Sequence, residues 1–335
     1  MFRKVVLISA VFILILLSAG ISLTIGWRPF IGPRMRATTS RQFERTPQRL
    51  ARGKYLATGI SDCTGCHSIR DWKSHGAPVV AGNEFSGQDF PLPGLPGRVV
   101  ATNITPDVET GAGGWTDDQL ARAIREGIGH DGRVIFPIMP YSAYKNMSDE
   151  DLASIVVYLR SLPPIRHPLP RTEIKFPVNY LIRSAPEPVT APVNGPTPSE
   201  QLKYGEYLVT IGGCSGCHTP QVHGQEIPGM RFAGGNVMNG PWGNVATANI
   251  TSDASGIGYY DEALFLQVMR TGYIKARELK SIMPYEEYRN LTDDDLKAMY
   301  AYMRTLQPVK HRVDNSLPPT DCKLCRQKHG AGDQN

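Results

Sequence analysis

The hydrophobic and polar positions divide the chain into an apolar start and a longer body in which charges are frequent. A run without charged residues extends over residues 5–26, directly after Arg3 and Lys4. A helix rises about 1.5 Å per residue, so a run of this length crosses a hydrocarbon layer of about 30 Å. Trp27 follows, where a tryptophan at the membrane surface belongs. The pattern therefore predicts a transmembrane helix within residues 1–27.

A cleaved signal peptide is the alternative interpretation of the same run. Its hydrophobic core would be residues 5–17, and Ser18-Ala19-Gly20 would be a passable cleavage site. The positive charges do not fix the orientation of the run, because arginines follow it as well as precede it. Export must therefore be inferred from the chemistry of the body.

Two similar halves make up most of the remaining chain. The recurring segments are Gly53-Lys-Tyr55-Leu56 with Gly205-Glu-Tyr207-Leu208, Asn103-Ile-Thr105 with Asn249-Ile-Thr251, Met139-Pro-Tyr141 with Met283-Pro-Tyr285, and Ser148-Asp-Glu-Asp-Leu152 with Thr292-Asp-Asp-Asp-Leu296. From Met139 onward the offset is a constant 144 residues. Chance does not maintain such order and spacing, so the sequence predicts two related domains, residues 40–165 and 199–310.

Each half has the hydrophobic spacing of helices separated by loops. Helices are expected over residues 50–58 and 200–211, leading into a pair of cysteines in each half. Ser148 and Thr292, each followed by aspartate at the third position, are expected to open the last helices as capping boxes. No strand pattern is persuasive, so the sequence predicts an all-α fold.

The segments outside the two halves differ from them in composition. Residues 166–198 are rich in proline, which predicts an extended, semi-rigid linker packed over the domains. Residues 311–335 form a C-terminal tail that contains two cysteines. The chain has 33 glycines and 27 prolines, which suits short helices and long loops around cofactors. Its net charge of +5 is small and gives no nucleic-acid footprint.

The six cysteines form three Cys-x-x-Cys pairs, and histidine directly follows the first two pairs. Cys-x-x-Cys-His is the attachment signature of c-type haem. Two thiols on one helical turn reach both vinyl groups of one porphyrin, and the next residue projects an imidazole at the iron. The sequence therefore predicts two covalently bound haem c groups. The residues expected to hold them are Cys63, Cys66 and His67 in the first half, and Cys214, Cys217 and His218 in the second.

Other chemistries account for these two motifs less well. The structural alternative is a pair of disulfides, each beside a spare histidine. Zinc would require a further Cys or His pair at finger spacing in each half, and neither half has one. Two matching motifs in a repeat, behind an export signal, favour haem.

The sixth iron ligand is expected to be methionine. Met139 and Met283 occupy equivalent positions in the two halves, and each precedes a proline that fixes the backbone. Methionine more often fills core space, but the other methionines of the two halves have no such partner. The rival ligands are His75, His130 and His223, of which no two are equivalent.

Three further pairs of residues match between the halves: Asn103 with Asn249, Arg125 with Arg270, and Trp115 with Tyr260. The asparagines either form hydrogen bonds near the haem edge or make ordinary Asx turns. The arginines either bind a propionate or place a positive charge at a helix C-terminus. The aromatic pair is expected to pack rather than to relay electrons.

The third cysteine pair, Cys322 and Cys325, lacks an adjacent histidine. In an exported protein such a pair is most simply a local disulfide. Two alternatives remain open: a metal site that includes His329, and a redox-active pair.

These motifs resemble the multihaem cytochrome c subunits of membrane-bound alcohol and gluconate dehydrogenases. The resemblance rests on the Gly-x-Tyr-Leu and Cys-x-x-Cys-His motifs, on Thr102-Asn-Ile-Thr-Pro-Asp107, on Gly114-Trp-Thr-Asp117 and on Met139-Pro-Tyr141. It covers about residues 45–165 and, more weakly, 200–310. It implies two class I cytochrome c domains with His/Met-ligated iron. Those subunits typically carry three haems, whereas this chain has two attachment motifs.

The expected function is electron transfer in the periplasm, with one helix holding the chain in the inner membrane. The chain would be a carrier or the electron-transfer subunit of a membrane-bound dehydrogenase, and not itself an enzyme. Its partners would be a periplasmic dehydrogenase, a quinone-linked complex or a terminal oxidase. The alternative is a haem enzyme, such as a dihaem peroxidase or a thiosulfate dehydrogenase, which would need a displaceable iron ligand. A redox sensor using Cys322 and Cys325 is a third hypothesis.

Overall fold

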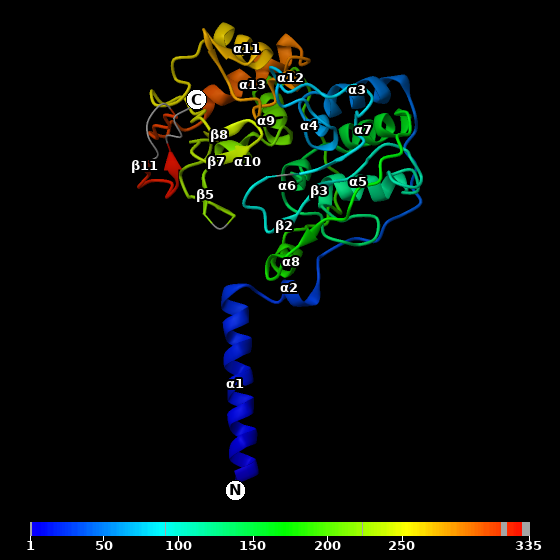
Figure 1. The fold of residues 1–335 in the computed structure, drawn as a ribbon, viewed down its shortest axis with the longest axis vertical. Helices are drawn as coiled ribbons and strands as arrows, with labels where there is room; N and C mark the ends of the chain where they lie inside the picture. Colours follow the sequence, from blue (N-terminus) through cyan, green and yellow to red (C-terminus); the bar gives the residue numbers. More distant parts are fainter. Residues whose placement is uncertain (1, 91, 223, 316–319, 330–335) are drawn as a thin grey trace.

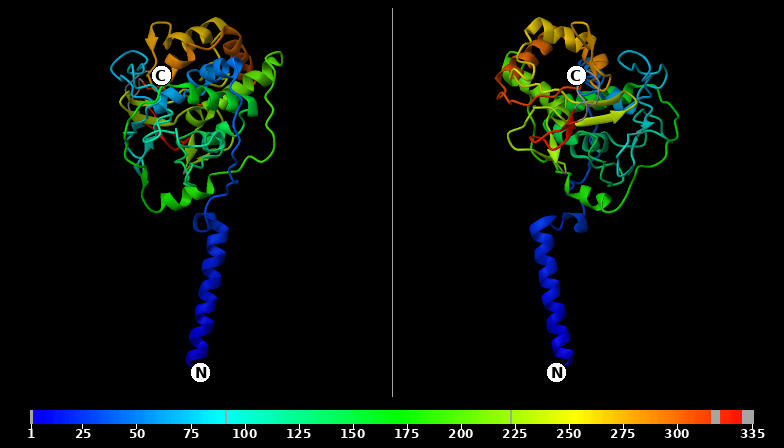
Figure 2. Two further views of the ribbon diagram at one scale, coloured as in Figure 1. Left: turned by 90° about the vertical axis from the view of Figure 1, so that its right-hand side faces the viewer. Right: turned by 60° about the vertical axis from the view of Figure 1, so that its left-hand side comes forward.

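The computed structural model describes residues 2–90, 92–222, 224–315 and 320–329. Helix α1 (Phe2–Thr24) stands apart from the body of the chain in Figure 1 and in both views of Figure 2. None of its residues is buried, and its apolar stretch has a mean hydropathy of 2.7. By length and composition, α1 is a candidate membrane span.

Two sets of helices, alike in order and length, build the body. Domain 1 contains α3 (Pro47–Ala57), α4 (Cys63–His67), α5 (Asp117–Glu126), α6 (Tyr141–Tyr144) and α7 (Asp149–Ser161). Domain 2 contains α9 (Gln201–Ile211), α10 (Cys214–His218), α11 (Glu262–Thr271), α12 (Tyr285–Tyr288) and α13 (Asp293–Thr305). The connecting segments contain α2 (Arg28–Ile31), α8 (Val178–Leu181) and the 3₁₀ turn η1 (Ile182–Ser184).

The described residues also form six antiparallel two-stranded ribbons. The pairs are β1 (Gln88–Asp89) with β3 (Val100–Ala101), β2 (Gly97–Arg98) with β4 (Glu173–Ile174), β5 (Gln221–Val222) with β6 (Gln225–Glu226), β7 (Val237–Gly240) with β8 (Gly243–Ala246), β9 (Tyr273–Ile274) with β10 (Arg277–Glu278), and β11 (Thr320–Asp321) with β12 (Lys328–His329). The expected all-α class therefore describes the helical scaffold only. Strands of two to four residues are too short to produce the alternation by which a sequence reveals a strand.

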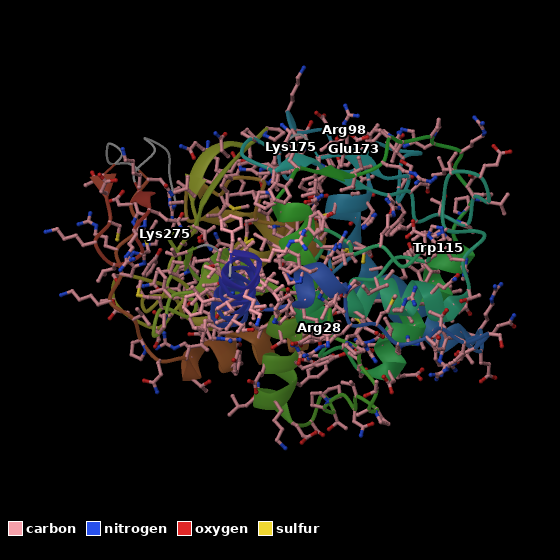
Figure 3. The ribbon with its side chains drawn as sticks, turned by 90° about the horizontal axis from the view of Figure 1, so that it is seen from below. Arg28, Arg98, Trp115, Glu173, Lys175 and Lys275 are labelled. Atoms are coloured by element: carbon pink, nitrogen blue, oxygen red, sulfur yellow. The ribbon has the colours of Figure 1, made fainter. Side chains whose placement is uncertain are left out.

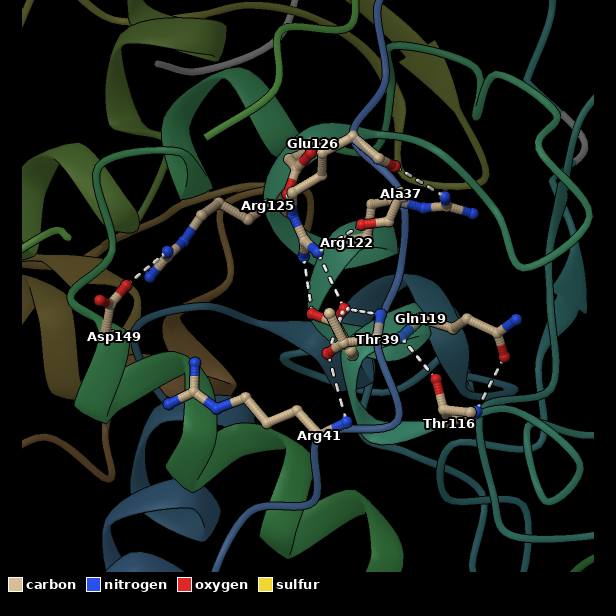
Figure 4. Close-up of polar contacts among 11 residues, drawn as sticks. Ala37, Thr39, Arg41, Thr116, Gln119, Arg122, Arg125, Glu126 and Asp149 are labelled. Carbon is tan, nitrogen blue, oxygen red and sulfur yellow. Dashed lines mark hydrogen bonds and ion pairs between the residues drawn. The ribbon is translucent and has the colours of Figure 1, made fainter. Parts of the chain in front are cut away.

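Side chains at the helix starts explain where the main helices begin. Thr116 and Gln119 form a full capping box at α5, as Figure 4 shows. Ser148 and Thr292 each accept a hydrogen bond from the amide three residues later, at the starts of α7 and α13. In both predicted capping boxes only the bond to the N-cap side chain is made by local residues. The N-cap amide donates to a residue from another part of the chain.

A tyrosine of the opposite domain completes each of these caps. The Ser148 amide donates to the hydroxyl of Tyr207 at 3.1 Å, and that hydroxyl donates to Asp151 at 2.6 Å. Tyr55 of domain 1 makes the equivalent two bonds at the start of α13, at 3.0 and 2.6 Å. The domains therefore face each other through two matched contacts.

A glycine allows the first helix of each domain to cross the last helix very closely. A Cβ atom at Gly53 would lie 1.9 Å from the carbonyl oxygen of Ser154 on α7, and one at Gly205 would lie 1.9 Å from that of Ala298 on α13. Only a residue without a side chain fits such an approach. This is the physical reason for the glycine in the repeated Gly-x-Tyr-Leu motif.

The proline-rich segment lies along domain 1. Its strand β4 pairs with β2, and the Val193 carbonyl accepts a hydrogen bond from the Asp149 amide at 2.9 Å. Figure 3 shows Arg98, Glu173 and Lys175 gathered at this edge. The segment thus reaches domain 2 while remaining bonded to domain 1.

Replacing Gly53 with alanine should destabilise the folded protein by about 1–3 kcal/mol, because the added methyl group overlaps the α7 backbone. Gly114→Ala is the matched control, since a Cβ atom there meets nothing within 4 Å. Thermal unfolding of both variants measures the difference. Equal midpoints for the two variants would contradict the close crossing.

Candidate functional site

Each Cys-x-x-Cys-His motif forms one short helix, α4 in domain 1 and α10 in domain 2. Both helices follow a residue with a left-handed backbone, Asp62 (φ 41°) and Gly213 (φ 65°). The Asp62 carboxylate accepts a hydrogen bond from the Gly65 amide at 2.9 Å, which helps a non-glycine residue to hold this conformation. The two domains thus present their cysteine pairs from the same local structure.

All four of these cysteines line one cavity of about 1560 Å³, to which both domains contribute. Pockets for drug-sized ligands measure about 300–1,000 Å³, so this cavity has room for two large, flat groups. Its wall is largely apolar and includes Leu120, Ile124, Leu159, Ile250, Phe265 and Val268. Paired thiols beside an imidazole, at an apolar wall, are the donor set that haem c requires, so the residues fit this cofactor.

The histidines of both motifs are held in the same orientation. The Nδ1 atom of His67 lies 2.7 Å from the Thr102 carbonyl oxygen, and that of His218 lies 2.7 Å from the Ala248 carbonyl oxygen. A carbonyl oxygen can only accept a hydrogen bond, so Nδ1 carries the hydrogen as the donor and Nε2 keeps its lone pair. Burial lowers the pKa of both imidazoles. Each ring therefore offers a neutral, oriented nitrogen ligand.

Met139 and Met283 also line the cavity, one from each domain. The Met139 amide donates to the Phe136 carbonyl at 3.1 Å, and the Met283 amide donates to the Lys280 carbonyl at 3.0 Å. The proline after each methionine is the N-cap residue of α6 or α12. The structure thus brings the predicted cysteines, histidines and methionines of both halves to the same cavity.

The rival histidine ligands are placed differently from one another. His130 lies at the cavity wall, but it is exposed and stacks on Trp115 at 4.4 Å between ring centroids. His75 does not line the cavity and lies 2.6 Å from a carboxylate oxygen of Glu278. His223 is outside the described residues. Among the described candidates, only the two methionines therefore occupy matching places.

The matched asparagines hold their own loops. Asn103 accepts a hydrogen bond from the Thr105 amide at 3.0 Å and donates to the Ile165 carbonyl at 2.7 Å. Asn249 makes the equivalent bonds at 2.9 and 2.8 Å. Both asparagines thus form the Asx turn that the sequence predicted as one of their two roles, and Asn249 also lines the cavity.

The matched arginines lie in the last turns of α5 and α11 and bind the start of the following long helix. Arg125 pairs with Asp149 at 2.6 Å and donates to the Met147 carbonyl at 2.6 Å, and Figure 4 shows the first of these contacts. Arg270 pairs with Asp293 in the same way. Neither guanidinium lines the cavity, so their positions favour the helix-terminal role over propionate binding.

Sequence reasoning missed two sets of residues around the cavity. Arg133 and Arg277 both line it and lie six positions before the matched methionines, so the 144-residue offset could have revealed them as candidate propionate partners. The side-chain amides of Gln88 and Asn236 donate to the carbonyls of the second cysteines, at 3.0 and 2.8 Å. Gln88 and Asn236 are not equivalent in the repeat, because the loops that separate them from Cys66 and Cys217 differ in length.

A buried ion pair joins the domains beside the cavity. Arg70 of domain 1 lies 3.0 Å from the Glu287 carboxylate of α12, and both side chains are almost fully buried. Arg70 also donates to the carbonyls of Ala77 at 2.6 Å and Gly76 at 2.9 Å. Burial raises the pKa of Glu287, and the attraction of Arg70 opposes this rise. Nothing in the repeat pattern predicts this contact between the halves, because Arg70 and Glu287 are far apart in the chain.

Fold and site together define a protein with two small helical domains, each presenting a Cys-x-x-Cys-His helix to a shared apolar cavity. The profile of the cytochrome c family matches residues 50–163 and 202–307. The chain therefore belongs to the cytochrome c family.

Three relatives of the chain illustrate the likeness. It is 29% identical over 276 residues to the cytochrome c subunit of the quinone-dependent alcohol dehydrogenase of Gluconobacter oxydans, covering 78% of this chain and 55% of that one. It is 30% identical over 271 residues to the gluconate 2-dehydrogenase cytochrome c subunit of Pantoea cypripedii, covering 76% and 59%. It is 28% identical over 261 residues to a dihaem c-type cytochrome of Cereibacter sphaeroides, covering 74% and 83%.

The chain thus spans little more than half the length of the two dehydrogenase subunits. The predicted resemblance to cytochrome c subunits of alcohol and gluconate dehydrogenases is confirmed. Cytochrome c domains imply covalently bound haem c and a role in electron transfer.

Replacing Arg70 with methionine should cost about 3–5 kcal/mol at neutral pH, because it leaves the Glu287 carboxylate buried and unpaired. Without Arg70, the folded-state pKa of Glu287 rises further above its usual 4.5. The part of the loss due to this carboxylate should therefore be absent below that pH and appear as the pH rises. Urea unfolding at several pH values measures it.

Two controls accompany this prediction. Arg166→Met removes an exposed ion pair with Glu109 and should change stability by about 0–1 kcal/mol. Adding Glu287→Gln to Arg70→Met should recover part of the loss at neutral pH, since the uncompensated charge is gone. A loss that is the same at every pH, with no recovery in the double variant, would contradict the buried pair.

Proposed function

We propose that this protein is a membrane-anchored dihaem cytochrome c that transfers electrons in the periplasm, as the electron-transfer subunit of a membrane-bound dehydrogenase or as a carrier that serves one. One observation carries the proposal above all others. Two Cys-x-x-Cys-His helices, each with a matched methionine, line a single cavity. Two attachment sites in one cavity suit the passage of electrons from one site to the other within the chain.

Each domain is proposed to hold one haem with its own residues. Cys63 and Cys66 would form the thioether bonds to the haem of domain 1, and His67 and Met139 would ligate its iron. The corresponding residues of domain 2 are Cys214, Cys217, His218 and Met283. The bound group supplies reversible one-electron oxidation and reduction of its iron. A methionine ligand would raise the reduction potential of the iron.

The chain's own residues set the conditions for this chemistry. The Thr102 and Ala248 carbonyls orient the imidazoles, and the apolar wall would keep water away from a bound haem iron. Tyr144 is buried at the cavity wall and donates to the Ser61 carbonyl at 2.6 Å, beside the attachment helix of domain 1. Burial raises the pKa of its hydroxyl, which therefore stays protonated as a donor.

Helix α1 is proposed to anchor the protein in the inner membrane, with both haem domains on the periplasmic side. The segment after α1 is bound to domain 1, because Arg36 pairs with Asp118 at 2.8 Å and with Glu126 at 2.7 Å. The domains would therefore be held close to the membrane surface. The charges around α1 do not fix its orientation in the membrane. Because haem c is attached outside the cytoplasm, we propose that both domains lie on that side.

The proposed organisation follows the repeat. It comprises an anchor at residues 1–27, a first cytochrome domain at 40–165, a linker at 166–198, a second cytochrome domain at 199–310 and a tail at 311–335. The names of the relatives suggest a dehydrogenase as the electron donor. We propose that it lies in the periplasm, on the same side as the haem domains. A quinone-linked complex or a terminal oxidase would be the acceptor.

The alternative haem enzymes need one iron whose sixth ligand can leave or is unusual. Both proposed sites have the same ligands, held by the same local bonds. Two closed iron sites suit electron transfer and leave no position at which peroxide or a sulfur substrate could bind. We therefore propose electron transfer rather than the activity of a peroxidase or a thiosulfate dehydrogenase.

The native protein, extracted from membranes with detergent, should have the mass of the complete chain plus two haem groups. Intact-mass spectrometry under denaturing conditions measures both quantities, because thioether bonds survive denaturation. Cys66→Ala should lose stable attachment in domain 1 while domain 2 keeps its haem. A mature chain without residues 1–27 in the soluble fraction would refute the anchor, and a mass without haem would refute the function.

Replacing Met139 with leucine should remove about half of the weak ferric absorption band that arises from methionine–iron bonds, and it should lower the potential of one haem. Met283→Leu should do the same to the other haem. Met147→Leu is the control, because Met147 is fully buried and does not line the cavity. Full band intensity and unchanged potentials in both cavity variants would disprove His/Met ligation.

A further inference from the structure

Four side chains of metal-binding type converge in domain 2, and none of them lines the cavity. They are His311, Cys322, Cys325 and His329, and their ligand atoms all lie within 4.8 Å of one another. Cys325 has no exposed surface, and the two histidines are 1% and 8% exposed. His311 was not among the expected partners of the third cysteine pair, because ten residues separate it from Cys322.

The spacing of the four ligand atoms suits one tetrahedral ion. The His311 Nε2 atom lies 3.3 Å from the Cys322 sulfur, and the His329 Nε2 atom lies 2.9 Å from the Cys325 sulfur. Zinc bonds of about 2.0–2.3 Å give ligand-to-ligand distances of about 3.3–3.8 Å in a tetrahedron. An ion between the four atoms therefore requires only small adjustments of the side chains.

We propose that His311, Cys322, Cys325 and His329 bind one Zn²⁺ ion in a closed Cys₂His₂ site. Two thiolates and two neutral imidazoles neutralise the charge of the ion, so the site can be buried. Four protein ligands leave no open position, which makes the ion structural rather than catalytic. The two sulfur atoms are not bonded to each other, so the structure does not contain the local disulfide that the sequence suggested.

Hydrogen bonding and packing by neighbouring residues hold the four side chains in place. The Nδ1 atom of His311 lies 2.8 Å from the Ala233 carbonyl, which directs Nε2 toward the sulfur atoms. Metal-binding histidines are normally oriented by such a bond. Met230 and Ala233 pack around Cys325 as a small apolar cluster of their own. The ligands are therefore positioned by residues that are not ligands.

Domain 1 provides an internal comparison, because His167 lies 144 residues before His311. Its Nδ1 atom lies 3.0 Å from the Ser86 carbonyl, in the same way as that of His311. It has no cysteine beside it among the described residues. The shared position thus fastens a loop in both domains, and the tail of the chain adds two cysteines and a second histidine in domain 2 only.

The ion would close the tail over the attachment helix of domain 2. Gln327 lies between Cys325 and His329, and it donates to the side-chain oxygen of Asn236 at 3.0 Å. Asn236 in turn donates to the Cys217 carbonyl at 2.8 Å. The zinc site would therefore hold the loop that supports the second haem-attachment motif.

Metal analysis of the full-length purified protein tests the proposal. Inductively coupled plasma mass spectrometry should find about one zinc per polypeptide, counted against amino-acid analysis so that haem content does not enter. Cys322→Ser and Cys325→Ser should each lower the zinc content at least about tenfold. His167→Asn is the control and should leave the zinc content unchanged.

X-ray absorption at the zinc edge gives a second readout that a merely structural cysteine pair would not produce. The expected shell has two sulfur atoms at about 2.3 Å and two nitrogen atoms at about 2.0 Å. Absence of zinc, a Cys322–Cys325 disulfide in peptide mass spectra, or a shell of oxygen and nitrogen alone would overturn the proposal. Zinc retained in both serine variants would overturn it as well.

Discussion

The hydroxyl groups of Tyr55 and Tyr207 fix how the two domains meet. Each hydroxyl accepts the N-cap amide of the opposite domain's last helix and donates to an aspartate in the same turn. The Tyr207 contacts are buried, and a buried amide or carboxylate that loses its partner costs about 1–3 kcal/mol. The two matched contacts therefore oppose sliding or rotation of one domain against the other. The close crossings at Gly53 and Gly205 place these tyrosines, because they bring the first helix of each domain against the last.

The shape of the cavity follows from this matched contact. The two domains are arranged with approximate symmetry, so α4 and α10 both face the same cavity. The buried Arg70–Glu287 pair also joins the two domains. A protein of two separate cytochrome domains would enclose each cofactor alone. Here the two attachment helices line one apolar cavity. This shared cavity is the physical reason for proposing that electrons pass between the two haems within the chain.

Much of the site could be predicted because its chemistry depends on local spacing. Two thiols and an imidazole on one helical turn leave a sequence signature, and the repeat identifies Met139 and Met283. The short ribbons were missed because two-residue strands have no periodicity. His311 and the Arg70–Glu287 pair were missed because residues distant in sequence meet only after folding. The half-formed caps at Ser148 and Thr292 were visible, but their tyrosine partners lie in the other half.

Anomalous diffraction at the iron edge, from crystals of the purified protein, tests the two proposed haem sites most directly. We expect two iron peaks in the shared cavity, one between His67 Nε2 and Met139 Sδ and one between His218 Nε2 and Met283 Sδ. A single peak, or an iron lacking either of these ligands, would contradict the proposal.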